Sequence, residues 1–207
     1  MKAKDFRKKA WAALTGNWGI AIITTIIVAA INGALAATGV GSVVTLLVSG
    51  PLTLGTVIVF TKIMKGEKPE IMNLFDGFKN FTNAFLLALV NSLFIALWSL
   101  LLVIPGIVKS YAYAMSFYIL NDHPEMTQSE ARAASIEMMK GHKWELFCLH
   151  FSFIGWMLLS ILTFGILMIW VTPYMQAAEV AFYQNLKGED ASTVQETVEE
   201  ANQVEVL

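Results

Sequence analysis

Long stretches without any charged residue dominate the chain. Three of them carry no Asp, Glu, Lys or Arg: the 52 residues between Lys9 and Lys62, the 29 between Lys79 and Lys109, and the 33 between Glu145 and Glu179. A helix that crosses lipid needs about 20 apolar residues, whereas a surface helix of a soluble protein shows a polar stripe. The stretches 20–31 and 85–104 show no such stripe. The pattern therefore predicts membrane-spanning helices rather than the core of a soluble domain.

Turn-forming residues divide these stretches into six predicted spans. Gly39-Val40-Gly41 interrupts the first, Pro105-Gly106 ends the second, and a turn near Thr163 divides the third. The spans, arranged as three hairpins, cover residues 18–37, 41–61, 81–103, 105–120, 144–162 and 165–185. We expect an all-α polytopic membrane domain over residues 1–188, followed by an acidic, solvated tail over 189–207. Pro51 and Pro173 are expected to kink or break their helices.

The positions of the positive charges favour an even number of spans. With six spans, thirteen of the 14 Lys and Arg residues fall on one side, and Lys109 is the exception. Because Lys and Arg concentrate on the cytoplasmic side, we expect a plasma-membrane protein with both termini in the cytoplasm. The alternative for the first span is a secretory signal cleaved after Ala34-Leu35-Ala36.

Composition narrows the class further. Hydrophobic residues make up 56% of the chain, charged residues 14%, and the net charge is -2. These values exclude a disordered chain and argue against a nucleic-acid partner. The single cysteine, Cys148, excludes a disulfide scaffold.

A short amphipathic segment precedes each predicted hairpin. Apolar residues at helical spacing occur at Phe6, Ala10, Ala13 and Leu14, and again at Ile71, Leu74, Phe75 and Phe78. Before the fifth span, Thr127 to Glu130 form a capping box, and the helix it opens is expected to stop at Gly141. We expect these helices to lie in the membrane interface; the alternative is that they are connectors packed on the bundle. The candidate membrane-surface contacts are Lys4, Arg7, Lys8, Trp11, Trp18, Lys143 and Trp144.

Several motifs resemble a known family. They are Gly16-Asn17-Trp18, Asp122-His123-Pro124, Lys140-Gly141-His142-Lys143-Trp144, Ser152-Phe153-Ile154-Gly155-Trp156 and Pro173-Tyr174. Together they resemble the domain of unknown function 975 family, integral membrane proteins found mainly in Gram-positive Bacillota. The resemblance extends to about Gly188 and implies a six-helix bacterial membrane protein. It implies no catalytic residues.

The candidate polar site consists of ionisable residues inside the predicted spans: Lys109, Glu179 and His150. Charges within a membrane cost at least about 2.5 kcal/mol, so they usually face a partner or a wet cavity. Lys109 and Glu179 would then form an ion pair or a proton-coupling element. The alternative is that each side chain reaches the nearer membrane surface. His142, Glu145 and His150 do not have an established metal-ligand spacing, and we expect no metal.

The sequence contains no recognisable catalytic or phosphate-binding motif. We therefore expect no enzymatic activity and no cofactor. The favoured interpretation is a non-enzymatic accessory, scaffold or regulatory membrane subunit. Its expected partners are the lipid bilayer and either another membrane protein or a second copy of the chain. The alternative is a small transporter or lipid-handling protein with a path near Lys109 and Glu179.

Overall fold

The computed structural model describes residues 2–37, 41–101, 103–163 and 165–205, and within them it contains helices and no strand. The helices, in chain order, are α1 (Ala3–Leu14), α2 (Trp18–Ala37), α3 (Gly41–Met64), the 3-10 helix η1 (Ile71–Asn80), α4 (Phe81–Leu101), α5 (Val103–Tyr113), α6 (Ser116–Asp122), α7 (Gln128–Met138), α8 (Lys143–Phe151), α9 (Ile154–Leu162) and α10 (Met168–Glu205). The all-α prediction is confirmed.

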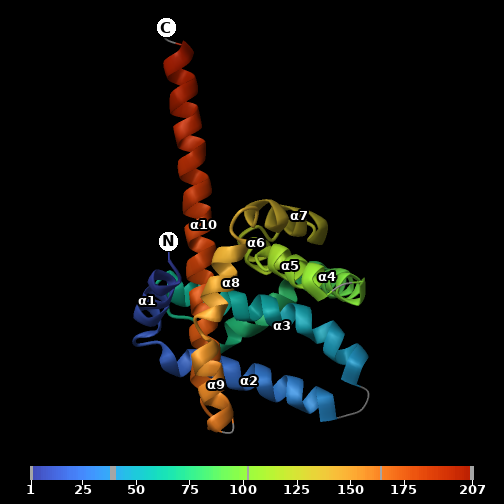
Figure 1. Ribbon diagram of the computed structural model, residues 1–207. Helices are drawn as coiled ribbons and strands as arrows, with labels where there is room; N and C mark the ends of the chain where they lie inside the picture. The colour runs from blue at the N-terminus through green and yellow to red at the C-terminus, as the bar shows by residue number, and fades with distance from the viewer. Residues whose placement is uncertain (1, 38–40, 102, 164, 206–207) are drawn as a thin grey trace.

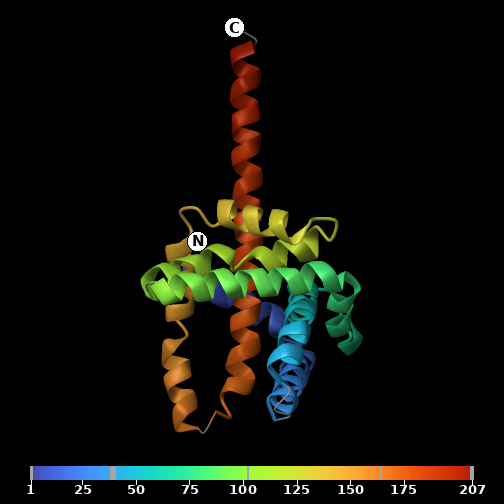
Figure 2. The ribbon, with the colours of Figure 1, turned by 90° about the vertical axis from the view of Figure 1, so that its right-hand side faces the viewer.

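Helix α10 runs through the centre of the bundle. Its first half is buried among α1, α2, α3, α8 and α9, and its second half projects away from the body (Figure 1). The backbone of the predicted tail is thus helical as far as Glu205 and forms the second half of α10. In both views the free ends of the α2–α3 and α9–α10 pairs lie at the lower end of the molecule (Figures 1 and 2). Helix α4 lies crosswise to α10, with α7 above it (Figure 2).

Four segments of the described chain are long and apolar enough to cross a membrane. They are Trp18–Leu35, Leu47–Met64, Ile71–Leu100 and Lys143–Leu162. Large apolar side chains on them are exposed, including Leu93, Leu100 and Leu162, which is costly in water and normal in lipid. These features are consistent with a membrane protein.

The prediction of six spans is not confirmed. The predicted fourth span, 105–120, consists of two short helices, α5 and α6, and an 11-residue helix is only about 16 Å long. The predicted sixth span lies in α10, where Gln176, Glu179 and the polar residues after them reduce the apolar character. The predicted turn between the fifth and sixth spans includes residue 164, which lies outside the described residues.

Two interruptions between consecutive helices occur at positions without proline. Of the expected kink or break at Pro51 and Pro173, the break is not seen, because α3 and α10 continue through these residues. Instead, α5 and α6 are separated at residues 114–115, and α8 and α9 at residues 152–153.

Side chains from distant helices satisfy the backbone groups that these breaks release. Ser135, fully buried on α7, donates to the Ala112 carbonyl (2.8 Å) and accepts from the Met115 N–H (3.2 Å). Arg7 on α1 donates to the Ser152 carbonyl (3.4 Å). Irregular backbone inside apolar surroundings needs such partners, so α7 and α1 stabilise the two breaks.

Glycines allow α3 to approach η1 and α4 unusually closely. A Cβ atom on Gly55 would overlap the Leu74 carbonyl, and one on Gly77 would overlap the Pro51 carbonyl. Small residues at such positions let helix backbones touch. This contact fixes the base of the α4–α5 hairpin.

The first amphipathic segment packs on protein. Phe6, Ala10 and Leu14 are fully buried, and the Phe6 ring meets the Phe182 ring of α10 edge to face at 5.3 Å. For this segment the structure favours the alternative, packing on the bundle, because α10 covers its apolar face. By contrast, α7 confirms the predicted capping box at Thr127, and Gly141 beyond it adopts a positive φ of 81°.

Candidate functional site

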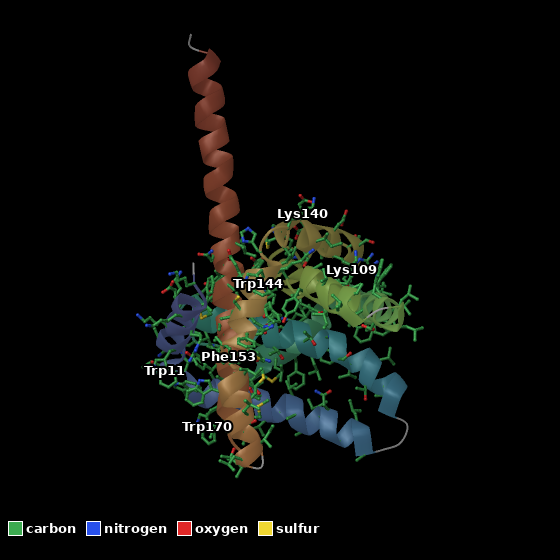
Figure 3. The ribbon with its side chains drawn as sticks, viewed as in Figure 1. Trp11, Lys109, Lys140, Trp144, Phe153 and Trp170 are labelled. Atoms are coloured by element: carbon green, nitrogen blue, oxygen red, sulfur yellow. The ribbon has the colours of Figure 1, made fainter. Side chains whose placement is uncertain are left out.

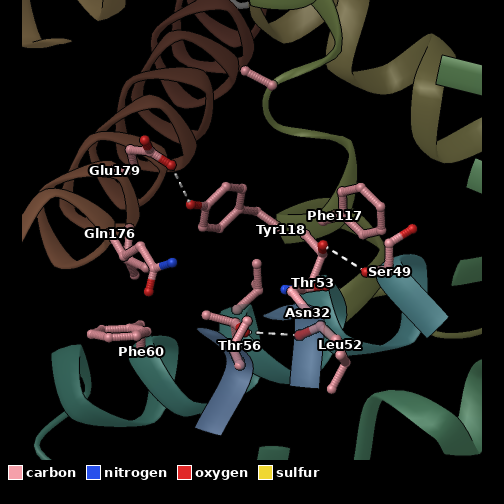
Figure 4. A pocket seen from close by; sticks show the side chains of 14 residues that line it. Asn32, Ser49, Leu52, Thr53, Thr56, Phe60, Phe117, Tyr118, Gln176 and Glu179 are labelled. Atoms are coloured by element: carbon pink, nitrogen blue, oxygen red, sulfur yellow. Dashed lines mark hydrogen bonds between the residues drawn. The ribbon is translucent and has the colours of Figure 1, made fainter. Parts of the chain in front are cut away.

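A polar cavity lies between α2, α3, α6 and α10, next to Glu179. Its volume is about 250 Å³. The polar side chains that line it are Asn32, Ser49, Thr53, Thr56, Tyr118, Gln176 and Glu179. Figure 4 shows Glu179 and Gln176 on one wall, opposite Thr53 and Thr56. Asn32 and Thr53 are exposed, so the cavity is open to the surface on that side.

Gln176, which lines the cavity, carries an acceptor without a hydrogen-bond partner among the described residues. Its carbonyl oxygen, Oε1, is buried and has no hydrogen-bond partner in the described part of the chain. Thr53 and Thr56, by contrast, donate to carbonyls of their own helix, at Ser49 and Leu52. A buried acceptor without a donor is costly, and a donor group of a bound solute would satisfy it.

Glu179 is the centre of a four-residue chain of polar groups. Its Oε2 atom accepts a hydrogen bond from the Tyr118 hydroxyl at 2.9 Å, and its Oε1 atom lies 2.9 Å from His150 Nε2. The other ring nitrogen of His150, Nδ1, lies 3.3 Å from the Tyr111 hydroxyl. Tyr111 and His150 each occupy the last turn of a helix that breaks immediately afterwards. The two breaks therefore bring the chain of polar groups to the cavity.

A second tyrosine–carboxylate bond repeats the first one turn further along the same helices. The Tyr183 hydroxyl of α10 donates to Asp122 Oδ2 of α6 at 3.0 Å, and the same atom accepts from Lys187 Nζ at 2.6 Å. The rings of Tyr118 and Tyr183 lie 5.4 Å apart. Donor and acceptor alternate between α6 and α10, and this fixes the register of the two helices.

The three predicted polar-site residues do not all meet. His150 and Glu179 are in contact, as the shared candidate site requires. Among the described residues, no ion pair joins Lys109 to Glu179. The Lys109 ammonium group lies over the Trp98 ring instead, 5.3 Å from its centroid. Figure 3 shows Lys109 on the α4–α5 hairpin. A lysine beside an aromatic face is stabilised by the ring quadrupole, so Lys109 belongs to the α4–α5 hairpin rather than to the cavity.

The predicted membrane-surface residues fall into two groups. Lys4, Lys8, Trp11 and Trp144 are exposed, while Trp18 and Lys143 are half-buried. Arg7 is half-buried, and its guanidinium group lies over the rings of Phe153 and Tyr174, at 5.2 and 5.9 Å. The expectation that Arg7 contacts lipid is therefore not supported, because it packs on protein.

Sequence reasoning missed Gln176 as part of this site. A polar residue within a span was the available signal, and Gln176 carried it, three positions before Glu179 on one helix face. Tyr111 and Tyr118 could line a pocket on sequence grounds, although such aromatic residues more often belong to interfacial belts or helix packing.

A sequence profile of the family described as "Protein of unknown function (DUF975)" matches residues 1–108 and 100–190. The chain belongs to this family. The resemblance seen in the sequence motifs is thereby confirmed, and residues 191–207 lie outside it. No curated protein and no solved structure matches this DUF975 chain.

Proposed function

We propose that this DUF975 protein is a small transporter that binds a polar solute in the Glu179 cavity. One observation carries the proposal: Glu179 and the unpartnered Gln176 carbonyl oxygen both line a polar cavity between apolar helices. Ionisable residues inside a membrane are costly and usually mark a substrate or proton pathway. The breaks that follow Tyr111 and His150 support the same interpretation, since discontinuous helices form the sites of many transporters. The proposed activity is non-enzymatic.

The lining favours a small cationic or neutral solute. No Lys or Arg is among the described residues that line the cavity, and Glu179 supplies a negative charge. A carboxylate repels anions and attracts cations. Pockets for drug-sized ligands run from about 300 to 1,000 Å³, so a cavity of about 250 Å³ suits a smaller molecule. A small amine would be attracted by the Glu179 carboxylate and could also donate a hydrogen bond to the Gln176 carbonyl oxygen.

The experiment measures the thermal stability of the purified full chain in detergent with a panel of small solutes: ethylamine, ethanolamine, choline and, as the anionic control, acetate. We expect at least one cation to raise the midpoint of unfolding and acetate to leave it unchanged. Glu179→Gln should abolish this rise.

Asp122→Asn is the matched control, because it weakens the similar hydrogen bond from Tyr183 to Asp122, which lies outside the cavity. It should lower the baseline midpoint and keep the rise. If no cation stabilises the protein, or if both variants lose the effect equally, the proposed cavity function is wrong. Uptake of the stabilising cation into proteoliposomes then separates transport from binding alone.

We also propose that the protein lies in the plasma membrane of a Gram-positive bacterium, with both termini in the cytoplasm. In the six-span arrangement the α2–α3, α4–α5 and α9–α10 pairs each cross the bilayer and return. Both termini and thirteen of the 14 Lys and Arg residues then lie on one side, as expected for the cytoplasmic side. Cysteine labelling in a Cys148→Ala background tests this, with Lys140→Cys expected to react only from inside and Ile166→Cys only from outside.

The accessory-subunit interpretation remains the second candidate, and one observation favours it. The far end of the α4–α5 hairpin is highly exposed and apolar, with Leu97, Leu100 and Ile104 at 54%, 86% and 75% exposure. A partner membrane protein would cover this surface. A photo-crosslinking residue at Leu97 should then react with one defined protein, whereas the same residue at Leu162 on α9 should react with lipid. Reaction with lipid alone at both positions would refute the accessory role.

A further inference from the structure

A groove lined by aromatic side chains lies on the opposite side of α10 from the Glu179 cavity. Its volume is about 340 Å³, and its walls include Trp11, Trp18, Trp156, Trp170 and Tyr174. Trp11 meets Trp18 and Tyr174 edge to face, at 5.3 and 5.6 Å between ring centroids. Four of the six tryptophans in the sequence thus gather at one place.

The walls of the groove suit an aliphatic chain. They are formed by flat aromatic rings with Leu167 and Val171 between them. Trp156 and Trp170 are 43% and 48% exposed, so the groove is open to the surroundings of the bundle. A peptide segment would leave its backbone amides unpaired against such walls, whereas an acyl chain has no polar groups to satisfy.

One end of the groove is positively charged. Lys4, Lys8 and Trp11 follow one another at four- and three-residue spacing, so they share one face of α1, and all three are exposed. The opposite face of α1, with Phe6 and Ala10, is buried against the bundle. Figure 3 shows Trp11 on α1 above Trp170, which lies near the start of α10. The basic residues therefore lie only at the α1 end.

We infer that this groove binds one anionic phospholipid, with an acyl chain against the tryptophans and the phosphate at Lys8 and Lys4. The charge complementarity selects an anionic headgroup over a zwitterionic one. Tryptophans at the headgroup level of a membrane place the polar and apolar parts at the matching depths. The inference depends on the membrane location and is independent of the Glu179 cavity.

Quenching of tryptophan fluorescence by brominated lipid tests the site. The full chain carries Trp98→Phe and Trp144→Phe, so that only the four groove tryptophans emit, and it is reconstituted in phosphatidylcholine vesicles. A fixed small fraction of either brominated phosphatidylglycerol or brominated phosphatidylcholine is then added. We expect stronger quenching by phosphatidylglycerol. Lys4→Gln with Lys8→Gln should reduce this preference roughly thirtyfold, as expected for two lysines near a membrane surface.

Two controls separate the groove from general attraction to the membrane. Lys65→Gln with Lys68→Gln removes the same charge from exposed positions elsewhere and should keep the preference. Trp170→Ala opens one wall and should reduce quenching by phosphatidylglycerol. Equal quenching by both lipids, equal loss in both double variants, or full preference in Trp170→Ala would each overturn the inference. Circular dichroism of every variant must match that of the parent.

Discussion

The Tyr118 hydroxyl donates to Glu179 at 2.9 Å, and the two residues are 61 positions apart in the chain. This bond orients the carboxylate that lines the polar cavity, while His150 holds its other oxygen. Tyr118 itself is buried, at 6% exposure. The bond therefore links the position of α6 to the geometry of the proposed solute site.

Tyr118→Phe removes only the hydroxyl and leaves Glu179 with one donor fewer. Hydrogen bonds to charged groups contribute about 1.5–3 kcal/mol when formed inside a protein, so we expect a loss near the lower value because Glu179 is partly exposed. Thermal unfolding in detergent measures it. Tyr113→Phe is the control, since Tyr113 is equally buried and no bond of its hydroxyl is found among the described residues. If both variants unfold at the same temperature, the bond contributes nothing.

Ser135→Ala should destabilise the break between α5 and α6. It leaves the Met115 N–H and the Ala112 carbonyl without their partner in a fully buried place, at a cost of about 1–3 kcal/mol. The control is Ser92→Ala on α4, where the serine is exposed and bonds only within its own helix. The midpoint of unfolding should fall for Ser135→Ala alone. An unchanged midpoint would show that the break does not depend on α7.

Arg7→Lys keeps the charge on α1 but not the planar group that lies against Phe153 and Tyr174. We expect a loss of about 1 kcal/mol, from the weaker aromatic contact and the lost bond to Ser152. Lys9→Arg, at an exposed position on the same helix, should have no effect. If Arg7 served only to attract lipid phosphates, Arg7→Lys would be as stable as the parent, and unfolding in detergent would show it.

Gly55→Ala should destabilise the contact between α3 and η1. The added methyl group would overlap the Leu74 carbonyl, and moving a backbone costs about 1–3 kcal/mol or more. Gly33→Ala on α2 is the matched control, because nothing lies within 4 Å of its added Cβ atom. That variant should be unchanged or more stable by up to about 1 kcal/mol, since alanine favours helix. The yield of folded protein and the unfolding midpoint distinguish the two.

The α7 capping box predicts a dependence on pH. The backbone N–H and the hydroxyl of Thr127 both donate to Glu130, and these bonds lower the pKa of the Glu130 carboxyl below its ordinary value of about 4.3. A lowered pKa in the folded state means that the bonds stabilise α7 at neutral pH and stop doing so as the pH falls through that lowered value.

Carbon-13 NMR of the labelled carboxyl group measures this titration directly. Thr127→Ala should move the pKa of Glu130 back toward the ordinary value. The exposed Glu137, outside the capping box, provides the reference signal. A pKa for Glu130 that is unchanged in Thr127→Ala would contradict the assigned cause.

The local features of the chain could be predicted because they depend on neighbouring residues. The predicted spans 18–37 and 81–103 correspond to α2 and α4 within two residues, and the capping box at Thr127 opens α7 as expected. A run of apolar residues or a Ser/Thr-x-x-Glu pattern acts within one helix, so the sequence records it directly.

The partners across helices could not be predicted, because they depend on how each helix is rotated and placed. Glu179 was recognised as a costly charge, yet Lys109 was the partner considered, while His150 and Tyr118 are the residues it meets. The breaks at residues 114–115 and 152–153 carry no proline, and they exist because Ser135 and Arg7 supply hydrogen bonds from elsewhere. The burial of the α1 apolar face had the same cause, since only the fold brings α10 against it.

The sequence alone thus determined an all-helical chain with long apolar helices and membership of a family. These properties follow from composition and from the spacing of residues along the chain. Both act locally, because the length of an apolar segment and the charges beside it decide whether it suits a membrane. The tertiary structure decided which polar groups meet, that they line a cavity, and that four tryptophans form a groove. Those outcomes depend on the packing of residues far apart in the chain, which no local pattern specifies.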